Sequence, residues 1–195
     1  MKHNTPGKAI AYEIRDYGEY FIIKAIVELV EKKLVKQTCY GTIGIDLNID
    51  HMAVCETDDK GNVVNTKIYR FDLSKKTSNQ RKAILQQSIK KCFDDVKARR
   101  KPIIIEELDF EQKKMEQLYK KKKYNAMLST FAYAQIKEYI IRRFYRGGIE
   151  VICVDPRNTS QIGKEKYRKA KGMSIHMSAS YVIARRGMGY KDTVT

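Results

Sequence analysis

The segment at residues 42–48, TIGIDLN, is a short apolar run with a single carboxylate, Asp46, close to its centre. Continuous apolar runs of this length are typical of strands that are buried on both faces of a sheet. A lone buried carboxylate is costly unless a neighbouring group neutralises it. Asp46 therefore has two interpretations: a structural acid bonded to nearby backbone, or a metal ligand at the centre of a sheet.

Two further strand-like segments follow this one along the chain. Residues 51–56 and 63–71 have strand composition, and the sequence DDKGN between them, at 58–62, is a strong turn signal. The pattern therefore places Asp46 on the first strand of a three-stranded meander.

Helix and strand patterns alternate after the meander. Thr77, Ser78 and Asn79 each offer a helix cap before residues that recur at helical spacing, and Pro102 ends the helix region. The segment 102–109, PIIIEELD, is a second short apolar strand that ends in acid. The remaining expected elements are a long helix over 124–146, a third buried strand over 149–155, a basic polar loop over 156–172 and a last helix from Ser174 to Gly187.

The predicted order is three meander strands, helix, strand, helix, strand and helix. It describes a mixed α/β domain whose sheet is flanked by helices, and it is the element order of the ribonuclease H-like fold. Residues 11–15 and 20–27 predict a separate β-hairpin. We therefore divide the chain into an N-terminal hairpin and connector, residues 1–40, interpreted as the end of a preceding domain, and a main domain, residues 41–195.

The charge balance is strongly basic and favours a polyanionic partner. The 195 residues contain 39 Lys and Arg against 23 Asp and Glu, a formal net charge of +16. Nucleic acid is favoured over a membrane, because no apolar run has membrane-spanning length and the N-terminal sequence is not that of a signal peptide. The scattered cysteines predict reduced thiols, a cytoplasmic protein and no structural zinc. They are Cys39, Cys55, Cys92 and Cys153.

Asp46 and Glu106 form the candidate metal centre. They lie on the first and fourth strands of the main domain, which can be neighbours in this topology. Two adjacent carboxylates repel each other unless a cation lies between them, and hard oxygen ligands suit Mg²⁺ or Mn²⁺. Such ions catalyse phosphodiester hydrolysis, which matches a nucleic-acid substrate.

Three segments carry a family resemblance: GID at 44–46, IIIEEL at 103–108 and VDPRNTSQ at 154–161. They resemble the RuvC-like nuclease domain of the TnpB (OrfB) proteins, which accompany insertion-sequence transposases and are similar to the RuvC domains of RNA-guided nucleases. The resemblance extends from about Gly41 to Gly189. It implies catalytic roles for Asp46 and Glu106, a DNA substrate and a role in DNA recombination. The similarity to RNA-guided nucleases also allows for a guide RNA. Full family members are longer, so the chain is expected to be a C-terminal piece or a truncated element.

Two departures from the family pattern place the chain in a subgroup without a zinc ribbon. No cysteine follows Cys153, although the family pattern has Cys-x-x-Cys pairs after the Thr-Ser-Gln motif. The third catalytic acid is also missing, and the resemblance places His176 where that acid normally opens the last helix. We therefore expect His176 to be a third ligand or a water-orienting group, although a capping or packing role is equally open. The corresponding Asp of some RuvC resolvases, three residues later, is Ala179 here.

Basic side chains around the expected site are candidates for contact with nucleic acid. Solvated surface charge is the competing explanation, and it is the favoured one for the lysine run at 120–123. The candidates are Lys120, Lys121, Lys122, Lys123, Lys164, Lys166, Arg168, Arg185 and Arg186. Two functions follow from the sequence: a TnpB-like, metal-dependent DNA endonuclease, or a nuclease-dead nucleic-acid-binding protein that keeps the fold.

Overall fold

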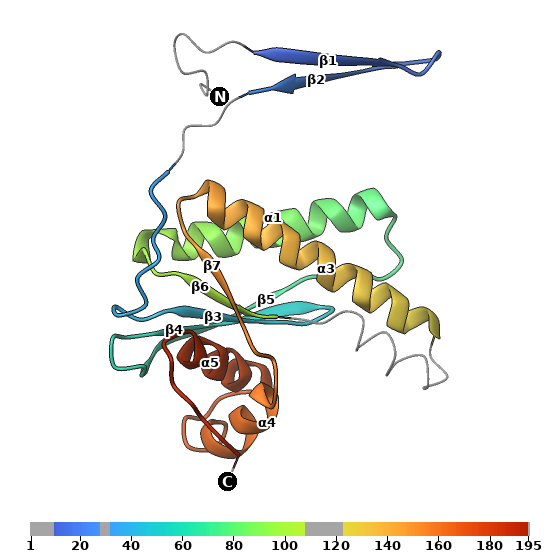
Figure 1. Ribbon diagram of the computed structural model, residues 1–195. Coiled ribbons are helices and arrows are strands. Elements are labelled where there is room, and N and C mark those ends of the chain that lie inside the picture. Colours follow the sequence, from blue (N-terminus) through green and yellow to red (C-terminus); the bar gives the residue numbers. More distant parts are fainter. Residues whose placement is uncertain (1–9, 28–31, 108–122, 195) are drawn as a thin grey trace. The chain divides into compact units, whose positions relative to one another are not determined.

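The computed structural model describes residues 10–27, 32–107 and 123–194, except for the side chains of residues 123–132. These residues belong to two compact units, which divide between Lys33 and Leu34 (Figure 1). The first unit contains the predicted hairpin, formed by β1 (Ala11–Asp16) and β2 (Phe21–Ile26). No helix in the described part of the chain is long and apolar enough to cross a membrane.

The second unit is built on a five-stranded mixed sheet in the order β5-β4-β3-β6-β7. Strands β5, β4 and β3 are antiparallel, as expected for a meander, whereas β3, β6 and β7 are parallel. The strands are β3 (Ile43–Leu47), β4 (His51–Thr57), β5 (Val63–Arg70), β6 (Ile103–Glu106) and β7 (Val151–Val154). Strand β3, which carries Asp46, therefore lies at the centre of the sheet, and all five of its residues are buried.

Helices cover both faces of this sheet (Figure 1). One face carries α1 (Ser78–Val96), which continues into a 3-10 turn at Lys97–Arg99, and α3 (Lys123–Arg146). The other face carries α4 (Thr159–Ile162), a π-helical turn (Gly163–Tyr167) and α5 (Ile175–Gly187). The main apolar core lies between the sheet and the α1/α3 layer. Its helical residues include Leu85, Ile89, Phe93, Ile136, Ile140 and Phe144.

The helix termini follow the signals in the sequence. Thr77 caps α1 in a capping box, in which its hydroxyl accepts from the Gln80 backbone and the Gln80 side chain accepts from the Thr77 backbone. Gly148, with φ of 79°, turns the chain out of α3 in the left-handed conformation that glycine adopts without penalty. Ser174 caps α5 by accepting from the Met177 backbone at 3.2 Å.

The two units divide between Lys33 and Leu34, and Val35 of the second unit forms a parallel bridge with Ile149. Two expectations need correction. Strand β7 is an edge strand and only half-buried, whereas the sequence predicted a buried strand. The segment at 156–172 is not simply a loop, since it forms α4 and the π-helical turn beneath α5.

Candidate metal centre

Asp46 and Glu106 occupy adjacent positions on the two central parallel strands. The register of β3 and β6 pairs Gly44 with Ile104 and Ile45 with Ile105, so Asp46 lies beside Glu106. Alternate residues of a strand point to the same face of the sheet. Both carboxylates therefore lie on the face that also carries Gly44 and Ile104, which is the face covered by α5.

Gly44 sets how closely α5 approaches this face. A Cβ atom at Gly44 would lie 2.1 Å from the Ser180 carbonyl oxygen and 2.5 Å from the Ala184 nitrogen. The backbone of α5 therefore packs directly against β3 at this point. His176 lies one turn before Ser180, and Asp46 lies two residues after Gly44. This close packing brings the first turn of α5 to the acid-bearing end of the strand.

His176 contacts Asp46 directly, with its Nδ1 atom 3.1 Å from Oδ2 of the carboxylate. Asn48, the next residue on the same face of the chain, donates to the same oxygen at 2.9 Å. Burial raises the pKa of Asp46, whose residue is only 8% exposed, while the bonds from Asn48 and His176 oppose this rise. Asp46 is thus a desolvated carboxylate that a bound cation would stabilise.

Glu106 is held by Thr159, the first residue of α4. The Thr159 hydroxyl donates to Oε1 of Glu106, and Thr159 is 2% exposed. Asn158, with φ of 60°, makes the turn that brings Thr159 under the end of β6. Glu107 is exposed and accepts from Lys137 at 3.2 Å, as expected for the residue that points to the opposite face. Between the two glutamates, the geometry favours Glu106 as the partner of Asp46.

The donor atoms present suit a divalent cation. Asp46 and Glu106 offer carboxylate oxygens, and His176 offers an imidazole nitrogen, a combination that Mn²⁺ accepts more readily than Mg²⁺ does. Among the described residues, no three His, Cys, Asp or Glu side chains are already arranged around a common point. The hydrogen bond between His176 and Asp46 uses the nitrogen and the oxygen that would coordinate an ion. Metal binding would therefore require a small rotation of the half-exposed His176 ring.

Sequence reasoning overlooked three residues of this centre. One is Asn48, two residues after Asp46. Alternate residues of a strand share a face, so this spacing in the sequence could have identified Asn48. Thr159 lies within the segment VDPRNTSQ that carried the family resemblance. His51 begins β4, and its ring packs edge-to-face on that of His176 with 4.5 Å between the ring centres. Only the pairing of β3 with β4 brings His51 to the site.

The predicted basic residues differ in how accessible their charges are. Lys164 and Arg168 are exposed, and Lys166 is half-buried. Arg186 donates to the carbonyl of Arg157 at 3.1 Å and to that of Asp155. Lys120, Lys121 and Lys122 lie outside the described residues, and for Lys123 only the helical backbone is described.

Arg185 has an internal role, which departs from the expected contact with nucleic acid. Its side chain is 15% exposed, and its Nε donates to Asp192 at 2.8 Å. The guanidinium also lies over the ring of Tyr190, 3.9 Å from its centre, and donates to the Gly61 carbonyl. These contacts hold the C-terminal segment to the β4–β5 turn and leave little of the group accessible to a phosphate.

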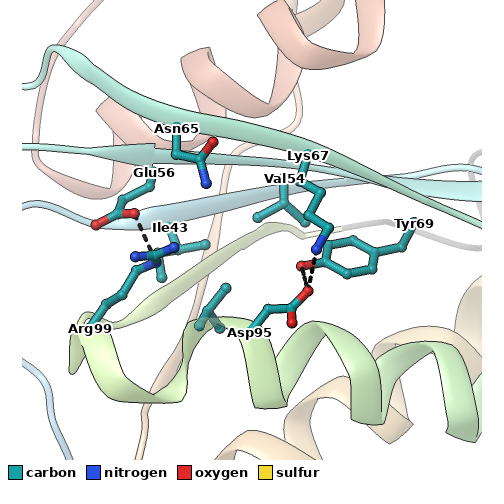
Figure 2. A pocket seen from close by; sticks show the side chains of 9 residues that line it. Ile43, Val54, Glu56, Asn65, Lys67, Tyr69, Asp95 and Arg99 are labelled. Carbon is teal, nitrogen blue, oxygen red and sulfur yellow. Dashed lines mark hydrogen bonds and ion pairs between the residues drawn. The ribbon is translucent and has the colours of Figure 1, made fainter.

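A polar cavity of about 210 Å³ lies on the opposite face of the sheet, between the meander and α1 (Figure 2). It is lined by side chains that pair with one another. Arg99 lies 2.9 Å from Glu56, and Asp95 accepts from Lys67 at 2.5 Å and from Tyr69 at 2.8 Å. Ile43 lines it, and Asp46 points to the other face, so the cavity is separate from the metal centre.

No protein-family model matches the chain. An uncharacterized protein of Saccharolobus solfataricus is 26% identical over 166 residues, which are 83% of this chain and 45% of that protein. The chain therefore spans less than half the length of this curated relative.

Two solved structures share the fold of the chain. Thermus thermophilus RuvC in complex with a Holliday junction substrate has a TM-score of 0.51 at 13% identity, over 73% of this chain and 88% of RuvC. Cas12f1 in its complex with sgRNA and target DNA has a TM-score of 0.52 at 15% identity, over 89% of this chain and 55% of Cas12f1. The prediction from the sequence is thus confirmed at the level of fold: the second unit has a ribonuclease H-like fold similar to that of RuvC.

Proposed function

We propose that the chain is the RuvC-like domain of a divalent-metal-dependent DNA endonuclease of the TnpB type. The observation that carries this proposal is the juxtaposition of Asp46 and Glu106 on adjacent parallel strands, with His176 bonded to Asp46 from the opening turn of α5. A buried carboxylate beside a second one is unfavourable without a cation. The arrangement is therefore better explained by metal binding than by stability.

Each residue of the centre has a distinct part in this function. Asp46 and Glu106 hold the cation through their oxygens, and His176 completes the set through a nitrogen or orients water. Asn48 and Thr159 fix the two carboxylates through the bonds that they donate. A bound divalent ion lowers the pKa of its water and neutralises charge on the leaving oxygen of a phosphodiester.

The charge of the chain and its structural relatives support DNA as the substrate. The net charge of +16 attracts a polyanion, and the exposed Lys164 and Arg168 lie in the sequence between Thr159 and His176. RuvC was solved with a Holliday junction, and Cas12f1 with sgRNA and target DNA. A guide RNA, association with a transposon and a cytoplasmic location are finer parts of the proposal.

Cleavage of single- and double-stranded DNA in Mn²⁺ and in Mg²⁺ tests the proposal. We expect cleavage by the wild type in Mn²⁺ and its loss in Asp46→Asn and in Glu106→Gln, because each removes an anionic ligand. Asp155→Asn is the matched control, since Asp155 is an exposed acid paired with Arg157 in a turn. Cleavage that survives Asp46→Asn would refute the assignment.

A nuclease-dead nucleic-acid-binding protein is the second candidate. The observation in its favour is Ala179, which stands where some RuvC resolvases carry a further Asp and is 1% exposed. The centre thus has two carboxylates and a histidine in place of a third acid. Salt-dependent DNA binding without cleavage in either metal ion would select this candidate.

A further inference from the structure

His51, close to the metal centre, has a buried ring nitrogen that has no hydrogen-bond partner among the described residues. The residue is 6% exposed, and its Nε2 atom is fully buried. A buried polar atom without a partner lowers stability, so such atoms are uncommon in folded proteins unless a ligand uses them. The other ring nitrogen, Nδ1, lies 2.6 Å from Oδ1 of Asp50.

The pairing with Asp50 determines which nitrogen of His51 can accept. Asp50 is an exposed carboxylate, which is an anion at neutral pH. An ionised carboxylate can only accept a hydrogen bond, so the Nδ1–H group of His51 donates to Asp50. In a neutral imidazole this leaves the lone pair on Nε2. A carboxylate that fixes a histidine in this way is the usual outer shell of a metal-bound imidazole.

The sheet register brings His51 to the same face as Asp46. Asp46 pairs with Ala53 in β4, so His51, two residues earlier, is the diagonal neighbour of Asp46 on the same face of the sheet. The rings of His51 and His176 are 4.5 Å apart at their centres and inclined by 78°. Two imidazoles that bind one ion at right angles, through bonds of about 2.1 Å, have ring centres roughly 4.6 Å apart. The two rings are therefore close enough to reach one ion once the half-exposed His176 ring turns away from its bond to Asp46.

We propose that His51 is a further metal ligand. Its Nε2 atom binds the same ion as Asp46 and His176. Two nitrogens and a carboxylate on one ion select a transition metal such as Mn²⁺ or Co²⁺ over Mg²⁺, whose shell prefers oxygen. This inference rests on the proposed function only in placing an ion at Asp46, and it does not require the chain to cleave DNA.

Metal binding to the full 195-residue chain tests the proposal, with Mn²⁺, Co²⁺ and Mg²⁺ each used alone as the probe in titration calorimetry. We expect Co²⁺ and Mn²⁺ to bind more tightly than Mg²⁺, and Co²⁺ to give the visible spectrum of a nitrogen-containing shell. His51→Ala should lower Co²⁺ affinity at least about tenfold, with little change for Mg²⁺. His3→Ala is the control for the remaining histidine.

The outcomes separate this inference from the nuclease proposal. Wild-type Co²⁺ affinity in a folded His51→Ala protein would overturn the inference, even if the chain cleaves DNA. Equal affinity for Co²⁺ and Mg²⁺ in the wild type would also overturn it. Binding that depends on His51 in a chain that cleaves no DNA would leave the inference standing and refute the nuclease instead.

A second measurement covers the case in which His51→Ala does not fold. Nitrogen NMR of the wild-type histidine side chains, with Cd²⁺ as the probe, reports directly on each ring nitrogen. A nitrogen–cadmium coupling at Nε2 of His51 is the expected result. An unchanged Nε2 resonance in the Cd²⁺-saturated protein would overturn the proposal, because the ion would then be bound without His51.

Discussion

The Nδ1 atom of His176 lies 3.1 Å from Oδ2 of Asp46, although the two residues are 130 positions apart in the chain. The contact joins the opening turn of α5 to the central strand of the sheet. It places an imidazole where the family resemblance places a third acid. Because a nitrogen ligand changes which metal ion a site prefers, the preference for one ion over another can be tested directly.

Replacement of His176 by Asp should shift the metal preference toward Mg²⁺. The variant gives the centre a third carboxylate in place of a nitrogen, and Mg²⁺ prefers oxygen ligands. We expect the ratio of Mg²⁺- to Mn²⁺-dependent cleavage to rise by about tenfold or more, since even outer-shell changes alter metal sites by 10–100-fold. Cleavage rates in each ion provide the measurement. His176→Ala, which should weaken metal binding without unfolding the domain, is the control, and an unchanged ratio in His176→Asp would contradict the ligand role.

Asp46→Asn should stabilise the metal-free protein while it abolishes cleavage. Burial raises the pKa of Asp46 above its ordinary value of 3.8, so its contribution to stability is present below pH 3.8 and is lost as the pH rises through the folded-state pKa. At pH 7 the ionised form is therefore a net cost. We expect a gain of about 0.5–2 kcal/mol in the free energy of unfolding. Urea denaturation in EDTA measures it, and addition of Mn²⁺ should reverse the order by stabilising only the wild type.

Thr159→Val should weaken the metal centre without large loss of the fold. Valine preserves the shape of threonine but removes the hydroxyl that donates to Glu106. We expect metal affinity and cleavage to fall by roughly 10–100-fold, the usual effect of removing such a supporting bond. Thr159→Ser keeps the hydroxyl and should retain most of the affinity. Equal Mn²⁺ affinity in the valine variant and the wild type would show that Thr159 has no positioning role.

The Arg185–Asp192 pair should contribute to stability in a pH-dependent way. Burial alone would raise the pKa of Asp192, but the bonds from Arg185 and Tyr167 lower it below the ordinary 3.8. The contribution is therefore present above pH 3.8 and is lost as the pH falls through the depressed pKa of the folded protein. We expect Arg185→Ala to cost about 2–3 kcal/mol at pH 7, less than a fully buried pair.

Urea denaturation at pH 7 and pH 3 measures this contribution. Asp192→Asn should flatten the acid limb of the profile, whereas Arg186→Ala, at a more exposed site, should change stability by less than about 1 kcal/mol. A normal stability of Arg185→Ala at neutral pH would return Arg185 to the set of candidate phosphate contacts.

Lys164 and Arg168 should affect DNA affinity and leave stability unchanged. Both are exposed, and each contact with a phosphate releases counterions. We expect each alanine substitution to weaken binding to all DNA sequences similarly and to reduce the slope of log affinity against log salt by about 1. Fluorescence anisotropy with labelled DNA over a range of salt measures this slope. Lys60→Ala, on the β4–β5 turn, is the control, and unchanged slopes in both variants would place the DNA path elsewhere.

The sequence by itself predicted the order of the long helices and of the strands, and it predicted that Asp46 and Glu106 lie side by side in the sheet. Local signals were sufficient for this, because the segments 42–48 and 102–109 each contain a continuous apolar run and because Thr77 and Ser174 are local helix caps. The motif resemblance added His176. Apolar runs, helix caps and motifs are local properties, because each is encoded by a few neighbouring residues.

Only the tertiary structure decided which side chains meet and which charges are used internally. His51 reaches Asp46 through the β3–β4 register, Thr159 reaches Glu106 through the fold of α4 under β6, and Arg185 is paired with Asp192. The half-buried state of β7 follows from its place at the edge of the sheet, which no local pattern encodes. The physical reason is that hydrogen bonds and ion pairs depend on distances of a few ångströms, and residues distant in sequence come that close only when the packed core fixes the register of strands and helices.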